Sequence, residues 1–445
     1  MTKLKVSPFL LVLALSILVP GLTIACRLSS KLVEQVQATP TPVVKTGLIA
    51  YAGTDANIYI IDHKGENQKA LTQDANLSPG QGASSRQYMF PTWAPDGIHL
   101  AFVEVSQSKE STPHSRLLSV NTQNLETIET FASDEFFPFY LYWSPDSQKI
   151  SFLSNGTTPG DLSLNLAFAD GSQNQVIDKG QPYYWDWSPD GKEIISHTGA
   201  SIGVNPEAKL AFLAVQDPYL SQNLDINPSF FQAPDWSPAG EAIALYAQTE
   251  KKGILMLLGK SGGERHIIDE SDGPVTFAFS PDGKQLAYSV ISKTQADLGY
   301  QDLYVVQISR PEEKKLLTTS VILGFFWSPD SEHMALFTPS SAGSGIESIS
   351  FRQAPQGIKF DLGVIDLVNS KSRHLIAFTP TESFLNIFPY YDQYQRSITL
   401  WSPDSREIVI AGNDNQDNPG IYVIDALEGG SARIATGDLA FWSWK

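Results

Sequence analysis

Short apolar runs separated by tight-turn signals fill residues 47–445. One repeat contains four apolar runs. A tight turn separates the first run from the second, and the third and fourth follow before the same kind of turn recurs, as at residues 93–125. Runs of four to eight residues rich in β-branched and aromatic side chains, bounded by Gly, Pro, Asp and Ser, predict strands. The pattern therefore predicts an all-β fold built from repeated four-stranded units.

The first turn of each unit is a five-residue motif, Trp-Ser-Pro-Asp-Gly or a close variant. Pro presets φ, Asp caps the turn and Gly accepts a positive φ, so the motif folds one strand back onto the next. Complete copies begin at Trp93, Trp143, Trp187, Trp236, Phe279, Trp327 and Trp401, and a truncated copy spans residues 441–444. The 74-residue interval from Trp327 to Trp401 contains no further copy, which predicts one unit with insertions.

Four short antiparallel strands in each 41–50 residues are the signature of a β-propeller blade. The motif resembles the WD40-like, TolB-type (PD40) propeller repeat, which also occurs in the propellers of dipeptidyl-peptidase-like enzymes. The resemblance covers nearly all of residues 47–445 and implies the fold rather than the function. Residues 48–51 match a second strand and residues 439–444 match a first strand, so we expect the C-terminal strand to complete the N-terminal blade. Seven motifs plus this shared blade predict eight blades, with seven as the alternative if the divergent unit at 187–235 is malformed.

Residues 1–46 have the composition of an export signal followed by a spacer. Lys3 and Lys5 precede an apolar run of about 11 residues, which suits a secretory signal and is too short for the roughly 20 residues of a membrane span. The end of residues 1–26 resembles a bacterial lipobox, which implies that Cys26 is lipidated; an uncleaved anchor or a buried free Cys26 is the alternative. Residues 27–46 form a Thr/Pro-rich tether. We therefore expect an exported, lipid-anchored protein of the cell envelope.

Charge and cysteine content exclude several classes of partner and site. The chain holds 31 Lys and Arg against 48 Asp and Glu, a net charge of −17, whereas a protein that binds the phosphates of nucleic acid needs a basic face. This charge also disfavours flat contact with an anionic membrane. The single cysteine excludes a disulfide scaffold and a multi-cysteine metal site.

Long connections are expected on only one face of the propeller. Second-to-third and fourth-to-first connections vary in length and open on one face, here called the loop face, whereas the motif turns lie on the opposite turn face. Binding residues concentrate on elaborated loops, and aromatic side chains there suit peptide or protein partners. The candidates for binding are Phe136, Phe137, Tyr183, Tyr184, Phe388, Tyr390, Tyr391 and Asp392. The alternative for each ring is packing between blades, which is also the expected role of the motif tryptophans.

No catalytic motif accompanies the repeat. The chain has no Gly-x-Ser-x-Gly elbow, its seven histidines are scattered, and we expect neither a metal nor another cofactor. The acidic, Asn-rich stretch 412–418 lacks the distal Glu of an EF-hand and fits a solvated loop better than a calcium site. The first hypothesis is a non-enzymatic, membrane-tethered scaffold that binds protein, peptide or envelope polymer on the loop face. The second is a hydrolase, lyase or lactonase-like enzyme with a site at the mouth of the channel, which requires several carboxylates or histidines to converge there.

Overall fold

The computed structural model describes residues 47–78, 84–108, 112–156, 161–199, 208–230, 232–250, 252–290, 300–340 and 358–445. All of these residues belong to the second of two units into which the chain divides, Met1–Val43 and Val44–Lys445. The predicted signal peptide with Cys26 and the predicted tether of residues 27–46 lie outside the described residues, as do parts of the predicted long connections.

Hydrogen bonding joins the described strands into seven sheets, and every pair of neighbouring strands in them is antiparallel. Six sheets have four strands. The first three of these are β31 (Gly437–Trp442), β1 (Ile49–Gly53), β2 (Ile58–Ile61) and β3 (Lys69–Ala70); β4 (Ser85–Trp93), β5 (His99–Gln107), β6 (His114–Asn121) and β7 (Thr127–Ser133); and β8 (Pro138–Trp143), β9 (Lys149–Asn155), β10 (Leu162–Phe168) and β11 (Asn174–Gly180).

The other three four-stranded sheets follow in chain order. They are β12 (Tyr183–Trp187), β13 (Glu193–Thr198), β14 (Lys209–Ala214) and β15 (Ser221–Asn223); β16 (Asp235–Trp236), β17 (Ala242–Gln248), β18 (Gly253–Gly259) and β19 (Arg265–Ser271); and β20 (Val275–Phe279), β21 (Gln285–Val290), β22 (Gln301–Gln307) and β23 (Arg310–Thr318). The seventh sheet has seven strands: β24 (Gly324–Trp327), β25 (His333–Pro339), β26 (Phe360–Asp366), β27 (Lys371–Pro380), β28 (Glu407–Asn413), β29 (Pro419–Asp425) and β30 (Ser431–Ala435).

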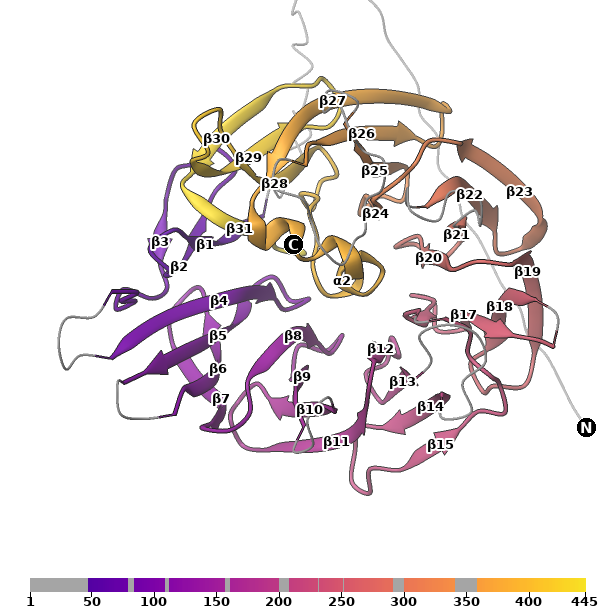
Figure 1. The fold of residues 1–445 in the computed structure, drawn as a ribbon, viewed down its shortest axis with the longest axis horizontal. Helices are drawn as coiled ribbons and strands as arrows, with labels where there is room; N and C mark the ends of the chain where they lie inside the picture. The colour runs from indigo at the N-terminus through magenta and orange to yellow at the C-terminus, as the bar shows by residue number, and fades with distance from the viewer. Residues whose placement is uncertain are drawn as a thin grey trace, which may run out of the picture. The chain divides into compact units, whose positions relative to one another are not determined.

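The sheets of this unit are arranged in a ring around a short helix, as Figure 1 shows. The prediction of an all-β propeller is therefore confirmed. Strand β31 pairs with β1, with Ile49 opposite Trp442, which is the pairing predicted for the two ends of the repeat region. In the seven-stranded sheet, β27 and β28 pair at two positions only, and Trp401 bridges Ile408 where the other sheets have a first strand. The divergent unit at 187–235, on which the seven-blade alternative depends, contributes β13, β14 and β15 to a four-stranded sheet.

The motif turns follow the geometry expected from their sequence. In the copy that begins at Trp143, the Ser144 hydroxyl donates to Asp146 Oδ1 over 2.5 Å, and the same carboxylate oxygen accepts the Gln148 N–H over 3.0 Å. The fifth position has a positive φ in every copy, including Ser147 at 60°. Where Ser replaces Gly there, its hydroxyl accepts the N–H of the motif Asp in the preceding copy, as Ser147 does from Asp96 over 3.0 Å. This bond between neighbouring turns offsets the cost of a left-handed residue that is not Gly.

The motif tryptophans pack one sheet against the next, in line with their expected structural role. Trp143 Nε1 donates to the carbonyl oxygen of Thr92 over 2.9 Å, and Thr92 is the residue just before the preceding motif aromatic. Three further motif tryptophans donate to the equivalent carbonyl of the preceding unit: Trp93 to Phe441, Trp327 to Ala278, and Trp401 to Phe326. Trp187 departs from this pattern and donates to the Ser151 hydroxyl.

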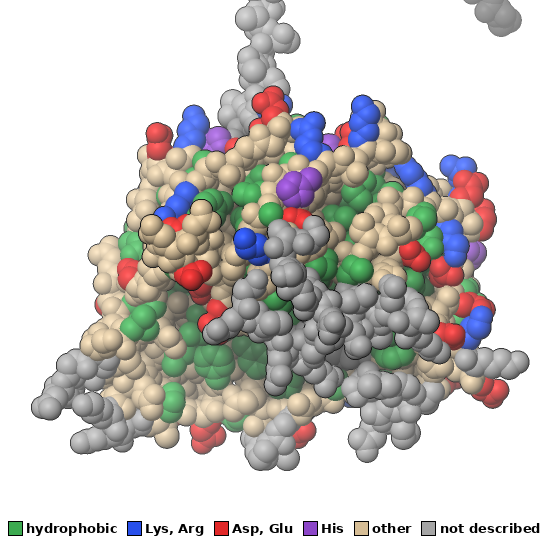
Figure 2. Space-filling view, turned by 45° about the horizontal axis from the view of Figure 1, so that its top comes forward, with side chains coloured by type: hydrophobic (Ala, Val, Ile, Leu, Met, Phe, Trp, Pro, Cys, Tyr) green, Lys and Arg blue, Asp and Glu red, His purple; other side chains and the backbone are tan. Residues whose placement is uncertain are grey.

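The outer surface carries charges of both signs. Figure 2 shows Lys and Arg side chains beside Asp and Glu side chains along the edge of the face in view, with hydrophobic side chains between them. Among the ion pairs of the described residues, Arg86 pairs with both Asp74 and the buried Glu104. Part of the excess of acidic residues is therefore balanced locally.

Candidate functional site

A short helical segment from the 74-residue interval occupies the centre of the ring. Residues 381–398, here called the plug, contain α1 (Glu382–Leu385), the 3-10 helix η2 (Phe388–Tyr390) and α2 (Tyr391–Ser397). Helix α2 contacts β8, β12, β20 and β24, each of which is the innermost strand of its sheet, so it lies in the central channel (Figure 1). The sequence predicted a long loop here, and the structure shows that much of this loop is helical and turned inward.

Aromatic packing holds the first half of the plug against the sheet that starts at β24. The Phe388 ring lies 4.9 Å from Phe337 and 4.8 Å from Phe360, centroid to centroid. Tyr391 packs edge-on against Phe325 at 5.7 Å. Phe388 and Tyr391 are each 2% exposed. These two predicted binding residues therefore act as core anchors in the structure.

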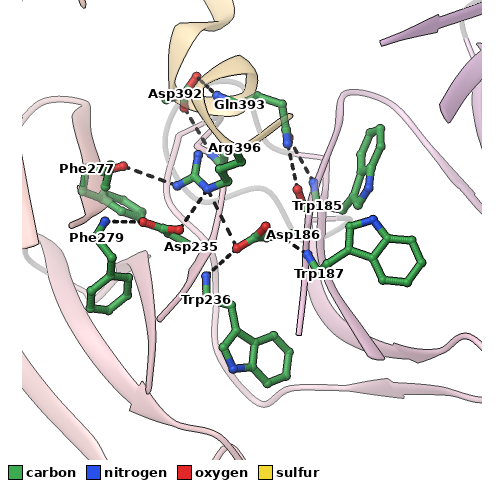
Figure 3. A network of polar contacts seen from close by, with 12 residues as sticks. Trp185, Asp186, Trp187, Asp235, Trp236, Phe277, Phe279, Asp392, Gln393 and Arg396 are labelled. Carbon is green, nitrogen blue, oxygen red and sulfur yellow. Dashed lines mark hydrogen bonds and ion pairs between the residues drawn. The ribbon is translucent and has the colours of Figure 1, made fainter. Parts of the chain in front are cut away.

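Hydrogen bonds to backbone groups hold the second half of the plug. The Gln393 side chain donates from Nε2 to the carbonyl oxygen of Trp185 over 2.7 Å and accepts the Trp185 N–H at Oε1 over 3.1 Å (Figure 3). The Tyr140 hydroxyl donates to the Gln393 carbonyl oxygen over 2.6 Å. Asp392 accepts the Ala233 N–H over 3.3 Å. The plug thus satisfies polar backbone groups that line the channel, a role that water would otherwise fill.

Arg396 forms the charged centre of the plug. Its Nε lies 3.1 Å from Asp235 Oδ1 and 3.9 Å from Asp186 Oδ2, and its Nη2 donates to the Phe277 carbonyl oxygen over 3.4 Å (Figure 3). The side chains of Arg396, Asp186 and Asp235 are 6%, 4% and 8% exposed. Because the two aspartates belong to β12 and β16, one guanidinium group joins the plug to two neighbouring sheets.

Both aspartates also accept backbone hydrogen bonds. Asp186 accepts the Trp236 N–H over 2.6 Å and the Tyr142 hydroxyl over 2.7 Å. Asp235 accepts the Phe279 N–H over 2.6 Å. Each carboxylate therefore bonds to the innermost strand of the next sheet, so the cluster fixes the spacing of three consecutive sheets.

Burial dominates the protonation of this cluster. It raises the pKa of Asp186 to about 7, against the opposing attraction of Arg396, and it raises the pKa of Asp235 and Asp392 in the same way. Burial alone would lower the pKa of Arg396, but the neighbouring Asp235 and Asp186 carboxylates raise it overall, so the guanidinium stays charged. The plug is therefore held by a permanent cation among carboxyl groups that titrate above their ordinary range.

Sequence reasoning missed Asp186, Asp235, Gln393 and Arg396, although a signal exists for the two aspartates. Each directly precedes a motif tryptophan, a position that holds a neutral side chain in the other copies: Thr92, Tyr142, Ala278, Phe326 and Leu400. The side chain at this repeat position points into the channel. An acidic residue there therefore indicates a basic side chain inside the ring that pairs with it.

Three of the predicted binding residues come together beside the plug. Tyr183, Tyr184 and Tyr390 line a cavity of about 300 Å³, here called the tyrosine pocket. Its other lining residues are Phe139, Tyr140, Leu153, Leu162, Gln181, Pro182, Gln393 and Tyr394. The pocket adjoins the starts of β10 and β12, so it lies on the loop face. Tyr390 is 48% exposed, while Tyr183 and Tyr184 are 2% and 6% exposed.

The hydroxyl groups in the tyrosine pocket are largely committed to protein partners. Tyr183 donates to Asp178 over 2.8 Å, and Tyr140 donates to the plug backbone. Burial raises the pKa of Tyr140, Tyr183 and Tyr184, so these side chains are neutral at physiological pH. The pocket therefore offers a ligand aromatic surface and few free polar groups.

The remaining predicted residues lie apart from this pocket. Phe136 and Phe137 are half-buried in the β7–β8 connection, where Phe137 packs edge-on against Phe90 at 6.4 Å. Asp392 is buried in the plug at 7% exposure. Among the eight predicted residues, Tyr390 alone has a largely exposed side chain that also lines the tyrosine pocket.

Within the described ranges, no group of three or more His, Cys, Asp or Glu side chains has the geometry to hold a metal ion. In the same part of the chain, no helix has the length and apolar character needed to cross a membrane.

Comparison with solved structures identifies the fold. Dihydro-heme d1 dehydrogenase NirN is 14% identical, with a TM-score of 0.52, and the match covers 90% of this chain and 76% of that one. A prolyl endopeptidase is 10% identical with a TM-score of 0.53 over 80% of this chain; the match spans half of the peptidase. The chain has the β-propeller fold. TolB from Acinetobacter baumannii also matches, at 12% identity and a TM-score of 0.37, over 76% of this chain and 81% of that one.

The predicted propeller resemblance is thus confirmed at the level of the fold. No protein-family model matches the sequence, and no curated relative matches it. Because propellers at this level of identity serve unrelated functions, the function has to be argued from the plug and the tyrosine pocket.

Proposed function

We propose that this protein is a non-enzymatic propeller scaffold, exported and tethered to a membrane of the cell envelope through Cys26, that binds a peptide segment or a polymer on its loop face. The observation that carries the proposal is the convergence of Tyr183, Tyr184 and Tyr390 on one cavity of about 300 Å³. A pocket of this size, lined by aromatic rings with few free polar groups, suits an apolar side chain of a larger partner.

The plug supports a binding role because it makes one wall of the pocket rigid. Gln393 and Tyr394 line the tyrosine pocket from the plug side, and Gln393 is fixed by two hydrogen bonds to Trp185. The Tyr394 ring packs edge-on against Tyr140 at 4.8 Å. A preformed aromatic wall loses little side-chain entropy when a partner binds.

The second candidate is a hydrolase or lyase, and the observation that favours it is the convergence of Asp186, Asp235 and Asp392 near the channel axis with raised pKa values. The scaffold is favoured over the enzyme because each of these carboxylates accepts hydrogen bonds from backbone groups that hold the ring or the plug together. These hydrogen bonds give the three carboxylates a structural role and leave them less free to act on a substrate.

A displayed library of random peptides, selected on the full-length protein, tests the proposal. We expect peptides with aromatic or prolyl side chains to be enriched. In isothermal titration calorimetry, Tyr390→Ala should weaken their binding about ten-fold, as expected for loss of one aromatic contact. The matched control is Leu427→Ala, which removes an apolar side chain of similar exposure, 42%, from the β29–β30 turn.

Equal affinity for the wild type and Tyr390→Ala would refute the tyrosine pocket as the binding site. Mass spectrometry of the incubated ligands addresses the second candidate. If the wild type cleaves a bound oligomer and Asp235→Asn does not, the protein is an enzyme and the scaffold proposal is wrong.

A further inference from the structure

A second cavity lies at the other end of the plug. It has a volume of about 180 Å³, and the prolines of three motif turns, Pro281, Pro329 and Pro403, line it together with Trp444 near the C-terminus. It therefore opens on the turn face, opposite the tyrosine pocket. For comparison, an engineered protein cavity of about 150 Å³ accommodates benzene. We call this cavity the arginine pocket.

Two buried hydrogen-bond donors on the walls of the arginine pocket lack an acceptor. Arg396 and Gln395 both line it. Arg396 Nη1 and Gln395 Nε2 are shielded from solvent, and neither has a hydrogen-bond partner among the described residues. The Arg396 side chain is 6% exposed, so the missing bond is not simply replaced by bulk water. An unsatisfied buried donor costs about 1–3 kcal/mol, and a bound acceptor would recover much of this cost.

The other polar groups of the arginine pocket are already paired. Thr399 exchanges hydrogen bonds with the Trp401 backbone, and the Ser443 hydroxyl donates to the carbonyl oxygen of Lys445 and accepts the Leu48 N–H. Asp235 uses one carboxylate oxygen for Arg396 and the other for the Phe279 N–H. Among the buried side-chain atoms of the residues that line the pocket, the two without a partner in the described part of the chain are therefore both donors.

The charges around Arg396 decide whether the acceptor group of a ligand in the arginine pocket is anionic, cationic or neutral. Arg396 already faces two carboxylates, at 3.1 Å and 3.9 Å, so its positive charge is neutralised and an added anion would be repelled by them. A cation is disfavoured because the two unpaired buried groups are donors, one of them on the positively charged Arg396. The indole rings of Trp327 and Trp401 donate their N–H groups to backbone carbonyls and leave apolar ring surface on the pocket wall.

We propose that the arginine pocket binds a neutral carbonyl group carried on an aromatic ring or a ring of similar size. The carbonyl oxygen accepts hydrogen bonds from Arg396 Nη1 and Gln395 Nε2, and the ring packs among the motif aromatics. This site is separate from the tyrosine pocket and does not depend on the proposed scaffold function.

Three probes of nearly equal shape test the charge preference: benzamide, benzoate and benzylamine. Binding to the full-length protein is measured by saturation-transfer NMR and by tryptophan fluorescence. We expect benzamide to bind with a dissociation constant on the order of 1 mM, as expected for a ligand of this size, and about ten-fold more tightly than the other two probes. Tighter binding of benzoate or benzylamine than of benzamide would overturn the proposal.

Gln395→Leu tests the location of the site. Removal of one neutral hydrogen bond should weaken benzamide binding about five-fold. The matched control is Gln175→Leu on β11, a half-buried glutamine whose Nε2 also has no partner among the described residues but which is not part of the pocket. Unchanged benzamide affinity in Gln395→Leu would overturn the proposal. If that variant does not fold, Gln395→Asn, which withdraws the amide by one methylene group, gives the same test.

Discussion

The repeated blades and the plug hold the molecule together in different ways. Buried motif aromatics recur around the ring, and four of the tryptophans make the same bond to the preceding unit, such as Trp401 Nε1 to the carbonyl oxygen of Phe326 over 3.1 Å. The plug occurs once: aromatic packing holds its first half, and buried polar groups with Arg396 at their centre hold its second half. Burial of apolar area stabilises directly, whereas a buried ion pair gains little beyond its desolvation cost. The blades therefore supply stability, and the plug fixes the positions of the channel walls and of both pockets.

The largest expected effect lies in the repeat. Trp401→Ala should lower the free energy of unfolding by about 3–5 kcal/mol, because it removes a fully buried ring and its bond to β24 of the preceding unit. Chemical denaturation of the full-length protein, followed by circular dichroism, measures this change. Trp401→Phe is the control: Phe279 shows that the motif position accepts this ring, so the loss should be clearly smaller. Equal losses for Ala and Phe would mean that ring packing between sheets is not what Trp401 contributes.

The next effect concerns the plug. Arg396→Met should cost about 3 kcal/mol at neutral pH, because the buried carboxyl groups of Asp235 and Asp186 lose their cation and must either stay charged and unpaired or take up a proton. The deficit should shrink on acidification, since burial already raises the pKa of Asp186 and Asp235 and protonation removes the unpaired charge. Arg433→Met is the matched control. Arg433 is 38% exposed and lies 3.9 Å from Asp414, so its loss should cost under about 0.5 kcal/mol. A similar small cost for both variants would show that the buried pair does not hold the plug.

The same contrast explains how much could be predicted from the sequence. The strands, the motif turns and the packing of Trp143 or Trp401 follow from a pattern that seven copies reinforce. The sequence pointed to Tyr183, Tyr184 and Tyr390 as separate binding candidates, but it did not indicate that they line one cavity, since only two residues connect β11 to Tyr183 and Tyr390 comes from a distant segment. Helix α2 has seven residues, too few for a hydrophobic period to show, and a helix of this length exists only through its tertiary contacts. The sequence therefore could not indicate that Tyr391 and Asp392 turn inward while Tyr390 stays exposed.

The smallest expected effect is the pH dependence that Asp186 adds to stability. Its pKa in the folded state is raised to about 7, mainly by burial, from an ordinary value of 3.8. A carboxyl group with a raised folded pKa contributes stability that is fully present below its unfolded pKa and is lost as the pH rises through its folded pKa. The wild type should therefore lose about 2 kcal/mol relative to Asp186→Asn between pH 5 and pH 7.5, because the amide cannot ionise.

Urea denaturation of both proteins across this pH range measures the difference. Asp186→Asn also changes the group that accepts the Trp236 N–H, at a cost that does not depend on pH. This cost cancels when only the slopes of the free energy of unfolding against pH are compared. Asp170→Asn supplies the control slope, since hydrogen bonds from Ser172 lower the pKa of that exposed carboxyl, and its contribution to stability changes only below pH 4. Parallel slopes for the wild type and Asp186→Asn would mean that Asp186 is already ionised at pH 5. Arg396 would then pair with two full charges throughout this range, and the attraction that holds the plug would weaken only below pH 5.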